Sequence, residues 1–284
     1  MTSLPDTIEQ LTGQRPDQVS SLSGGCVGEV YKLSMPDGHD LVAKVGKPHS
    51  GLDVEGRMLT YLAKHSALPV PQVHLASELL LVMDVLPSGG DLGPQAQIHA
   101  ADLVAELHAL TTSNGFGFAF DTVIGGLTQP NPWQVNWLTF FRDHRLLYMG
   151  QEAVRAGRLP ASMMLRLDRF AAKLDRWLDE PDQPSLIHGD MWTGNVLSER
   201  GRITGVIDPA LYFANCEIEL AFSTLFNTFG PAFFDRYQEH RPLKPGFFEE
   251  RVDIYNLYPL LVHVRLFGGS YVQSVDRILK RFGF

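Results

Sequence analysis

The chain has 284 residues, of which 44% are hydrophobic and 20% charged, and its formal net charge is −8 at pH 7. This composition is typical of a globular protein of one large domain or two lobes, and the acidic balance argues against nucleic-acid or membrane-surface binding as the main function. The two cysteines have no zinc-ligand spacing, the first ten residues lack a secretory signal, and no apolar stretch is long enough to span a bilayer, so we expect a cytoplasmic protein.

The first third of the chain predicts strands and turns around one helix. Two short β-prone runs, 28–34 and 40–45, flank a Pro-Asp-Gly turn and predict a hairpin. Apolar residues at helical spacing predict a helix over 52–65. The continuous apolar run 79–86 has the length of a buried strand, and the glycine-rich segment 87–93 after it predicts a hinge.

The remainder of the chain predicts mostly helices. Apolar periodicity places them at 96–110, 137–156, 161–178 and in the tail 247–284. Short strands are expected at 186–187, 196–197 and 203–207. The change from strands to helices divides the chain into an N-lobe, 1–86, and a C-lobe, 87–284.

The sharpest local signal is a polar loop between two apolar strands, His188-Gly-Asp190-Met-Trp-Thr-Gly-Asn195, followed later by Val-Ile-Asp208. Protein kinases use H-R-D-x-x-x-x-N, in which the Asp accepts the proton of the attacking hydroxyl and the Asn binds Mg²⁺. Each residue alone would more often serve a turn hydrogen bond. Together they predict Asp190 as the catalytic base and Asn195 and Asp208 as metal ligands, whereas His188 is expected to have a structural role.

A glycine-rich turn precedes the first hairpin strand. Residues 23–30, Ser-Gly-Gly-Cys-Val-Gly-Glu-Val, fit the kinase pattern G-x-G-x-x-G-x-V with a serine in place of the first glycine. Glycines let backbone N–H groups approach phosphate oxygens closely. Alone, the pattern is also that of an ordinary turn between strands. The residues expected to bind nucleotide here are Gly24, Gly25, Cys26, Val27 and Gly28.

Two charged residues follow in the order that a kinase requires. Lys44 lies in Val-Ala-Lys-Val on the second hairpin strand, where a buried lysine is costly unless it meets an anion. Glu55 lies on the next helix and can form the ion pair that positions Lys44 on the nucleotide phosphates. The alternatives are a solvent-facing lysine and a surface carboxylate. By analogy of fold, the adenine is expected to bind the hinge backbone at Met83, Asp84, Val85 and Leu86.

The parts that serve a protein substrate are missing. After Asp208 the chain runs through Leu-Tyr-Phe-Ala-Asn directly into an apparent helix from Glu217, with neither D-F-G nor A-P-E. Gly189 stands where H-R-D has its arginine, so the usual partner of an activating phosphate is absent. These features favour a constitutive kinase that acts on a small or exposed hydroxyl.

The loop HGDMWTGNVL and the continuation VIDPALYFANCEIELA resemble the fructosamine/ketosamine-3-kinase family, which includes protein-ribulosamine 3-kinases and is related to aminoglycoside phosphotransferases and choline kinases. The resemblance covers most of the chain from about Ser20 to Thr228. It implies an α+β, bilobal protein-kinase-like fold with a small β-rich N-lobe and a larger helical C-lobe. It also implies use of ATP and Mg²⁺ to phosphorylate the sugar 3-hydroxyl of ketosamines, free or on protein lysines, in deglycation repair.

Four residues are candidates for the substrate side of the site. Trp192, inside the loop, could offer an aromatic face to the sugar or its amine, or could simply pack. Glu217 and Glu219 could receive hydroxyls or the amine, or could be helix N-terminal carboxylates. Trp133 is a weaker candidate for the same cleft. Thr193, Asn215, Cys216 and Glu219 depart from the family pattern, which bears on substrate preference rather than on the chemistry.

The sequence leaves two alternatives of different class open: an aminoglycoside- or choline-type kinase, and a kinase-fold protein that binds nucleotide without catalysis. We expect a monomer or weak dimer. Cys26 lies in the loop that admits ATP, where neighbouring N–H groups and Lys44 would favour a thiolate. A Cys26–Cys26 disulfide between two copies is therefore expected under oxidation, since Cys216 should lie in the other lobe.

Overall fold

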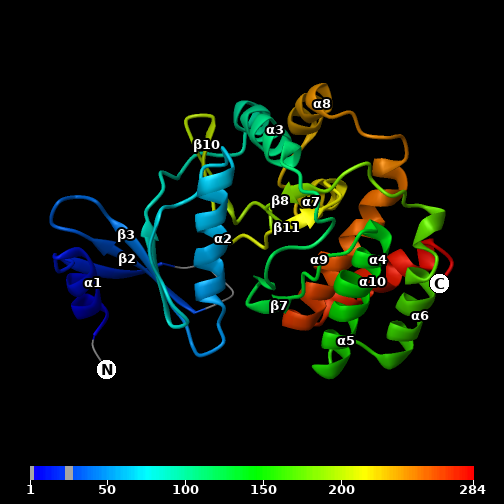
Figure 1. Ribbon diagram of the computed structural model, residues 1–284, viewed down its shortest axis with the longest axis horizontal. Coiled ribbons are helices and arrows are strands. Elements are labelled where there is room, and N and C mark those ends of the chain that lie inside the picture. Colours follow the sequence, from blue (N-terminus) through cyan, green and yellow to red (C-terminus); the bar gives the residue numbers. More distant parts are fainter. Residues whose placement is uncertain (1–2, 23–27) are drawn as a thin grey trace.

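The protein is described by a computed structural model that covers residues 3–22 and 28–284. Its N-terminal part is a five-stranded antiparallel sheet with the strand order β1-β2-β3-β5-β4, at the left of Figure 1. The strands are β1 (Gln18–Leu22), β2 (Glu29–Ser34), β3 (Leu41–Val45), β4 (Val73–Ala76) and β5 (Leu80–Asp84). The predicted hairpin is the pair β2–β3, and the predicted apolar strand is β5.

Two helices cover the two faces of this sheet. Side chains alternate along a strand, so the neighbours Leu81 and Val82 of β5 face opposite sides. Val82 packs with Ile8 of α1 (Leu4–Thr12), and Leu81 packs on α2 (Leu52–His65). The helix predicted over 52–65 is therefore α2, with the same bounds. A residue of β3 that pairs with Leu81 points toward this helix.

Helix α1 was not expected, because one helix was predicted in this third of the chain. The local signal for it is a capping box, in which Ser3 and Asp6 exchange side chain-to-backbone hydrogen bonds of 3.3 Å. Pro5 stands in the first turn, where its missing N–H costs nothing. Gly13 ends the helix in the left-handed conformation with φ of 77°. The prediction of a single helix was wrong because these cap residues were not read as a helix start.

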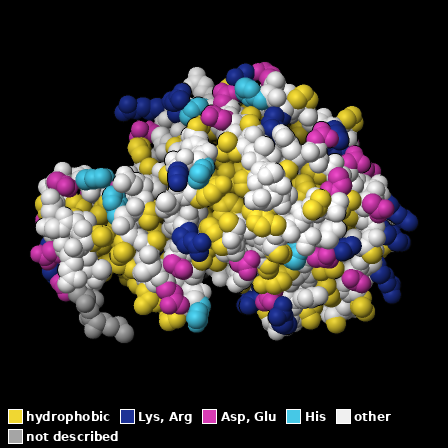
Figure 2. Space-filling model, viewed as in Figure 1, with side chains coloured by type: hydrophobic (Ala, Val, Ile, Leu, Met, Phe, Trp, Pro, Cys, Tyr) yellow, Lys and Arg dark blue, Asp and Glu magenta, His cyan; other side chains and the backbone are white. Residues whose placement is uncertain are grey.

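The C-terminal part is larger and mostly helical (Figures 1 and 2). In Figure 2 the N-terminal sheet and its two helices form a narrower body at the left of the larger C-terminal part. Within the described ranges, no helix is long and apolar enough to cross a membrane. The α-helices here are α3 (Pro94–Ala109), α4 (Trp137–Phe141), α5 (Tyr148–Arg155), α6 (Ala161–Ala171), α7 (Glu217–Leu225), α8 (Pro231–His240), α9 (Val252–Phe267) and α10 (Ser270–Arg281).

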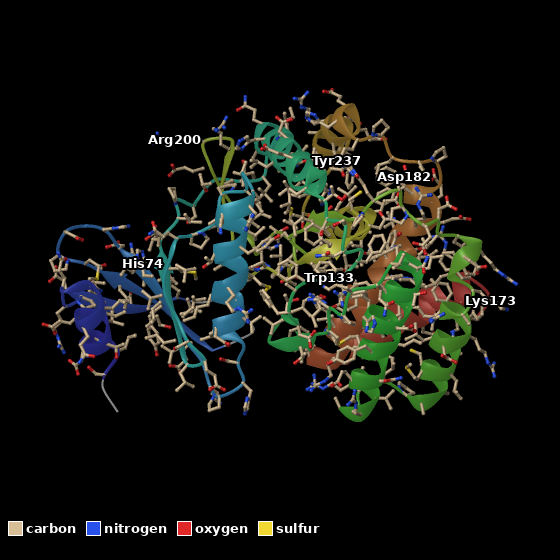
Figure 3. All side chains as sticks on the ribbon, in the orientation of Figure 1. His74, Trp133, Lys173, Asp182, Arg200 and Tyr237 are labelled. Atoms are coloured by element: carbon tan, nitrogen blue, oxygen red, sulfur yellow. The ribbon has the colours of Figure 1, made fainter. Side chains whose placement is uncertain are left out.

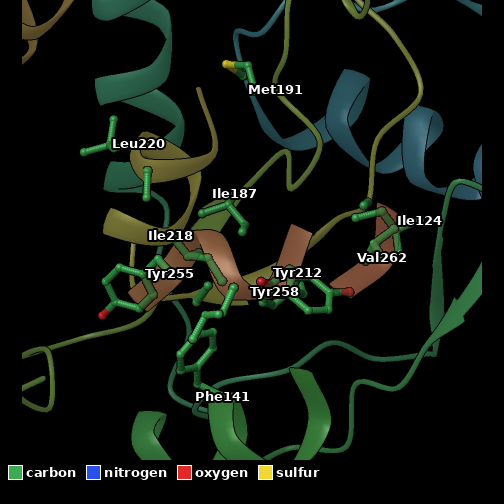
Figure 4. Packing of buried hydrophobic residues seen from close by; sticks show 14 of the residues in the cluster. Ile124, Phe141, Ile187, Met191, Tyr212, Ile218, Leu220, Tyr255, Tyr258 and Val262 are labelled. Atoms are coloured by element: carbon green, nitrogen blue, oxygen red, sulfur yellow. The ribbon is translucent and has the colours of Figure 1, made fainter. Parts of the chain in front are cut away.

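Helix α9 forms the centre of the C-terminal core. Ten of its sixteen residues, from Ile254 to Val264, are buried, and the helix packs against α7, α5 and α10. Figure 4 shows Tyr255 and Tyr258 of α9 near Ile218 of α7 and Phe141 of α4, and Val262 of α9 beside Ile124. The middle of a helix that is apolar around its circumference must be covered on all sides, so the segment Ile254–Val262 packs against α7, which in turn supports the catalytic loop.

Three short antiparallel pairs of strands accompany these helices. Strands β8 and β9 flank the catalytic loop, as predicted, and β10 precedes Asp208. Strand β11 was missed: the sequence predicted a direct passage into the helix from Glu217, but β11 first pairs with β8. The β6–β7 hairpin and β4 were also missed. The bounds are β6 (Thr122–Ile124), β7 (Leu127–Gln129), β8 (Ser185–Ile187), β9 (Val196–Glu199), β10 (Arg202–Val206) and β11 (Tyr212–Ala214).

The long helices predicted from periodicity are interrupted. The helix expected over 137–156 is α4, a π-helical turn η1 (Arg142–Leu147) and α5. The turn carries Arg145, a fully buried side chain that donates to Pro130 O at 2.8 Å and lies 3.8 Å above the Tyr212 ring. The other interruptions are 3₁₀ turn η2 (Leu174–Arg176), π-helical turn η3 (Phe247–Arg251) and the positive-φ pair Gly268–Gly269 between α9 and α10.

Candidate active site

The lysine and glutamate predicted from the sequence meet on the α2 face of the sheet. Lys44 pairs with Leu81 across the ladder, so its side chain points toward α2, and its Nζ donates to Glu55 Oε1 at 2.7 Å. Both side chains are buried. Burial disfavours the charged form of Lys44, but the carboxylates of Glu55 and Asp208 outweigh it and hold the pKa of Lys44 above its ordinary value.

Asp208 completes this cluster from the C-terminal part. It follows β10 with φ of 55°, a left-handed conformation that is uncommon for a residue other than glycine. Its carboxylate pairs with Lys44 Nζ. Lys44 therefore bridges a helix carboxylate of the N-terminal part and the carboxylate expected to hold the metal.

The catalytic loop brings Asp190 and Asn195 together. Asn195 Nδ2 donates to the backbone oxygen of Asp190 at 2.8 Å and to Asp190 Oδ2 at 2.9 Å. Burial, with the negative charge of Asp208, raises the pKa of Asp190 to about 8, although the hydrogen bond from Asn195 opposes this. His188 is fully buried and accepts the N–H of Asp190 at 3.3 Å through Nδ1, a place that fits the structural role expected for it.

Gly189 is required by the backbone of this loop. Its φ is 84°, and a Cβ at this position would collide with the backbone oxygen of Ala210. Its N–H donates to Glu219 Oε1 at 2.7 Å. The arginine of H-R-D therefore has no room here, which gives a steric reason for its absence.

The residues that could hold a divalent cation are Asn195 and Asp208. The N–H of Ile207 donates to Asn195 O at 3.0 Å, which ties the two segments together. Because Asn195 directs its amide nitrogen at Asp190, its amide oxygen is the atom left for a ligand. Among residues 3–22 and 28–284, no group of three or more His, Cys, Asp or Glu side chains could hold a metal. Two protein oxygen ligands suit Mg²⁺, which usually completes its shell with water and substrate phosphates.

The expected nucleotide-binding turn is only partly described. Gly24, Gly25, Cys26 and Val27 lie outside the described residues. Gly28 has φ of 78°, and a Cβ there would collide with Val45 O. A glycine is therefore needed where the turn passes the end of β3.

The four expected hinge residues have different surroundings. Met83 is buried on the α2 side of the sheet. The N–H groups of Asp84 and Val85 donate to Gln72 O at 3.0 Å and Asp40 O at 3.3 Å. The side chain of Leu86 lies against Gly205, where a Cβ would not fit. The carboxylate of Asp84 pairs with His74 Nε2 at 2.6 Å. Figure 3 labels His74 on the N-terminal sheet.

Known proteins with the same overall design were found by sequence and by structure. A model of the fructosamine kinase family matches residues 1–282. A probable ketoamine kinase of Synechocystis is 32% identical, over 98% of this chain and 95% of its own. The probable ketoamine kinase YniA of Escherichia coli K12 is 32% identical, over 95% and 96%.

The chain belongs to the fructosamine kinase family. A structure from Thermobifida fusca, assigned as a fructosamine-3-kinase, has a TM-score of 0.86 at 30% identity and covers 98% of this chain and 99% of its own. An aminoglycoside phosphotransferase solved with ADP and hygromycin B has a TM-score of 0.71 at 18% identity over 100% of both chains, which shows the shared fold. The predicted bilobal protein-kinase-like fold is thus confirmed, as is the prediction of a kinase that transfers phosphate to a sugar hydroxyl.

The four residues expected on the substrate side of this fructosamine kinase do not form one cluster. Trp192 is 36% exposed; its indole lies over Gly194 and 5.7 Å from the Phe226 ring. Trp133 packs against Phe213 at 6.1 Å, and Figure 3 places it in the C-terminal part. Of the four candidates, Trp192 alone belongs to the catalytic loop.

The two glutamates have protein partners. Glu217 accepts two hydrogen bonds from Arg251, at 2.7 and 2.8 Å. Glu219 is 2% exposed and accepts from Gly189 N and from His108 Nε2, the latter at 2.8 Å. Both carboxylates are thus occupied within the protein.

Sequence reasoning missed a buried chain of hydrogen bonds behind the catalytic loop. Tyr237 of α8 contacts His108 Nδ1 at 2.8 Å, His108 contacts Glu219, and Glu219 accepts the N–H of Gly189. All three side chains are buried. A lone histidine on an apolar helix, as His108 is on α3, gives no signal of partners more than 100 residues away in sequence.

A cavity of about 350 Å³ lies at the Tyr237 end of this series of hydrogen bonds, rather than at the catalytic loop. It opens where β8 and α7 begin and includes Tyr237 in its wall. Cys216, a free thiol whose pKa burial raises, lies beside Tyr237 in the same wall. The cavity is lined by three basic side chains, Arg241, Lys244 and Arg251, and by a similar number of acidic ones. The charge of its wall therefore favours neither an anionic nor a cationic ligand.

Proposed function

We propose that this protein is an ATP-dependent kinase that phosphorylates the sugar 3-hydroxyl of ketosamines, free or on protein lysines, in deglycation repair. The observation that carries the proposal is the convergence of Lys44, Glu55 and Asp208 beside the paired Asp190 and Asn195. Family membership supplies the substrate class.

In this proposal each polar residue has one task. Asp190 accepts the proton of the attacking hydroxyl, and Asn195 holds the carboxylate in place. Lys44, oriented by Glu55, binds the α- and β-phosphates. Asn195 and Asp208 would hold Mg²⁺, which when bound neutralises charge on the β- and γ-phosphate oxygens. The raised pKa of Asp190 suits a base that works near neutral pH.

The binding surfaces around these residues are also part of the proposal. Residues 1–86 and 87–284 would act as two lobes with the nucleotide between them. The phosphates would lie under Gly24, Gly25, Cys26, Val27 and Gly28, and the adenine at Met83, Asp84, Val85 and Leu86. Trp192 would face the sugar or its amine, and Trp133 would line the same cleft. Glu217 and Glu219 would support the site from behind, because their carboxylates are occupied.

We further propose a cytoplasmic monomer or weak dimer in which oxidation links two copies through Cys26. The test is activity after diamide and then dithiothreitol, in wild type and Cys26→Ala. Equal responses of the two proteins would show that Cys26 is no redox switch.

The test of function is a coupled ADP-release assay against a fructosamine, a ribulosamine, kanamycin and choline. We expect turnover of the two ketosamines alone. Turnover of kanamycin or choline instead would favour an aminoglycoside- or choline-type kinase. Nucleotide binding without turnover of any acceptor would favour a non-catalytic protein, which the presence of Lys44, Asp190, Asn195 and Asp208 argues against.

A further inference from the structure

Five aromatic side chains form a continuous line that begins in the catalytic loop. Their ring centroids are 5.7 Å apart between Trp192 and Phe226, 5.1 Å between Phe226 and His263, 4.8 Å between His263 and Tyr271, and 5.7 Å between His263 and Phe267. The loop, the end of α7, the last turns of α9 and the start of α10 each contribute to it. We call these five residues the aromatic strip.

The aromatic strip is open to solvent at both ends. Trp192 is 36% exposed and Phe267 is 55% exposed, whereas the three rings between them are half-buried. An exposed aromatic row that continues a catalytic loop differs from the fully buried aromatics of the α9 core. Large exposed apolar surface usually marks a binding site.

The strip carries no positive charge. Burial lowers the pKa of His263, which favours the neutral ring, although the hydrogen bond with Pro259 O opposes this. The same bond, from Nδ1 to Pro259 O at 2.7 Å, holds the ring in one orientation. Aromatic faces attract organic cations and bury alkyl chains. The strip therefore suits a ligand that combines an amine with an apolar stem.

A ketosamine has this chemistry in the required order. Its amine is attached to C1, two carbons from C3, whose hydroxyl would meet Asp190. Trp192 is two residues from Asp190, and its backbone N–H donates to the backbone oxygen of Asp190 at 3.2 Å, so the aromatic strip begins in the same turn of the loop as the proposed base. Any substituent on the amine must then continue away from the sugar.

We propose that the aromatic strip is the subsite for the amine substituent of the ketosamine, so that this enzyme prefers ketosamines of long apolar amines, such as a lysine side chain, over those of short amines. This inference rests on the proposed function and extends it to the part of the substrate that is not phosphorylated. Phe267, at the far end, determines specificity without touching the reacting atoms.

The experiment compares the ketosamines of methylamine and hexylamine, which differ only in the alkyl chain. We expect wild-type kcat/KM to be about 3- to 10-fold higher for the hexylamine ketosamine. Phe267→Ala should bring this ratio close to one, mainly through KM, and Phe267→Tyr, which keeps the ring, should preserve it. Phe248→Ala is the matched control, because Phe248 is an aromatic of similar exposure, 51%, on η3 and outside the strip.

The outcomes separate the two proposals. Turnover of both ketosamines with the same ratio in wild type and Phe267→Ala would overturn the subsite and leave the proposed function standing. An equal change of the ratio in Phe248→Ala would also overturn the subsite, because the effect would then be general. No turnover of either ketosamine by wild type would overturn the proposed function and the subsite together.

Discussion

The N–H of Gly189 and the carboxylate of Glu219 are joined by a hydrogen bond of 2.7 Å, although one residue lies in the catalytic loop and the other in the buried face of α7. The other oxygen of the same carboxylate pairs with His108. The backbone next to the proposed catalytic base, Asp190, is thus held by a side chain that is itself buried.

Removing this support should damage catalysis in graded steps. Glu219→Ala leaves the Gly189 N–H and His108 Nε2 buried without a partner, at a cost of about 1–3 kcal/mol for each group. We expect a clear loss of melting temperature and a fall in kcat larger than the rise in KM for ATP. Tyr237→Phe removes only the outer hydroxyl and should cost about 1 kcal/mol.

The matched control for that series is Tyr61→Phe, a half-buried tyrosine of α2 that packs against His65 and meets Phe118 edge-on, outside the hydrogen-bonded chain of Tyr237, His108 and Glu219. It should leave kcat and melting temperature close to wild type. If Tyr237→Phe and Tyr61→Phe behave alike and Glu219→Ala retains wild-type kcat, the buried chain does not position the loop.

Asp190→Asn should lower kcat by about 10²- to 10⁴-fold while nucleotide binding persists, because the amide keeps the shape but cannot accept the proton. The same change should raise the melting temperature at alkaline pH. The folded protein favours the protonated form of Asp190, whose pKa rises from the ordinary 3.8 to about 8. As the pH rises through this range the wild type loses folding stability, whereas the asparagine variant, which does not ionise, does not. Turnover within a few-fold of wild type would remove Asp190 from the role of base.

The pH profile should carry the signature of the same carboxyl. Since the ionised form is the active one, kcat/KM should rise with pH and level off above about 8, the pKa of Asp190 in the free enzyme. The residual activity of Asp190→Asn should lack this rise. A rising limb that persists in the variant would assign the titration to another group, such as the amine of the substrate.

Asp208→Ala should abolish Mg²⁺-dependent binding of ATP and turnover together, because the carboxylate is one of only two side chains proposed to hold the cation. Isothermal calorimetry with ATP, with and without Mg²⁺, measures this directly. The variant should show no gain in affinity when Mg²⁺ is added. An unchanged affinity for Mg-ATP would exclude Asp208 from the metal site.

The local part of this site could be predicted from the sequence, and the supporting part could not. Lys44 and Glu55 were found because a lysine in an apolar strand needs a carboxylate, and the next helix offers one at its first turn. Asp190 and Asn195 were found because their spacing is fixed by a short loop. The partners of Glu219 were not found, because His108 lies 111 positions earlier in the chain and only the packing of α3, α7 and α8 brings it near.

The interruptions of regular structure were missed for a related reason. Periodicity predicts a continuous helix over 137–156, and it carries no information about the buried Arg145, which packs over Tyr212 at the π-helical turn. Strand β11 is three residues long and exists because β8 is available for pairing. In each case the deciding contact is made by a residue distant in sequence.

The close approach of Gly189 to Ala210 has a consequence for the engineering of this enzyme. Phosphorylation switches of the kind found in protein kinases use an arginine at this position to capture the phosphate. Here the carbonyl of Ala210 occupies the space of any side chain, and the φ of 84° disfavours one independently. Substitution at this single position therefore cannot install such a switch, and a designer would have to rebuild the segment after Asp208 first.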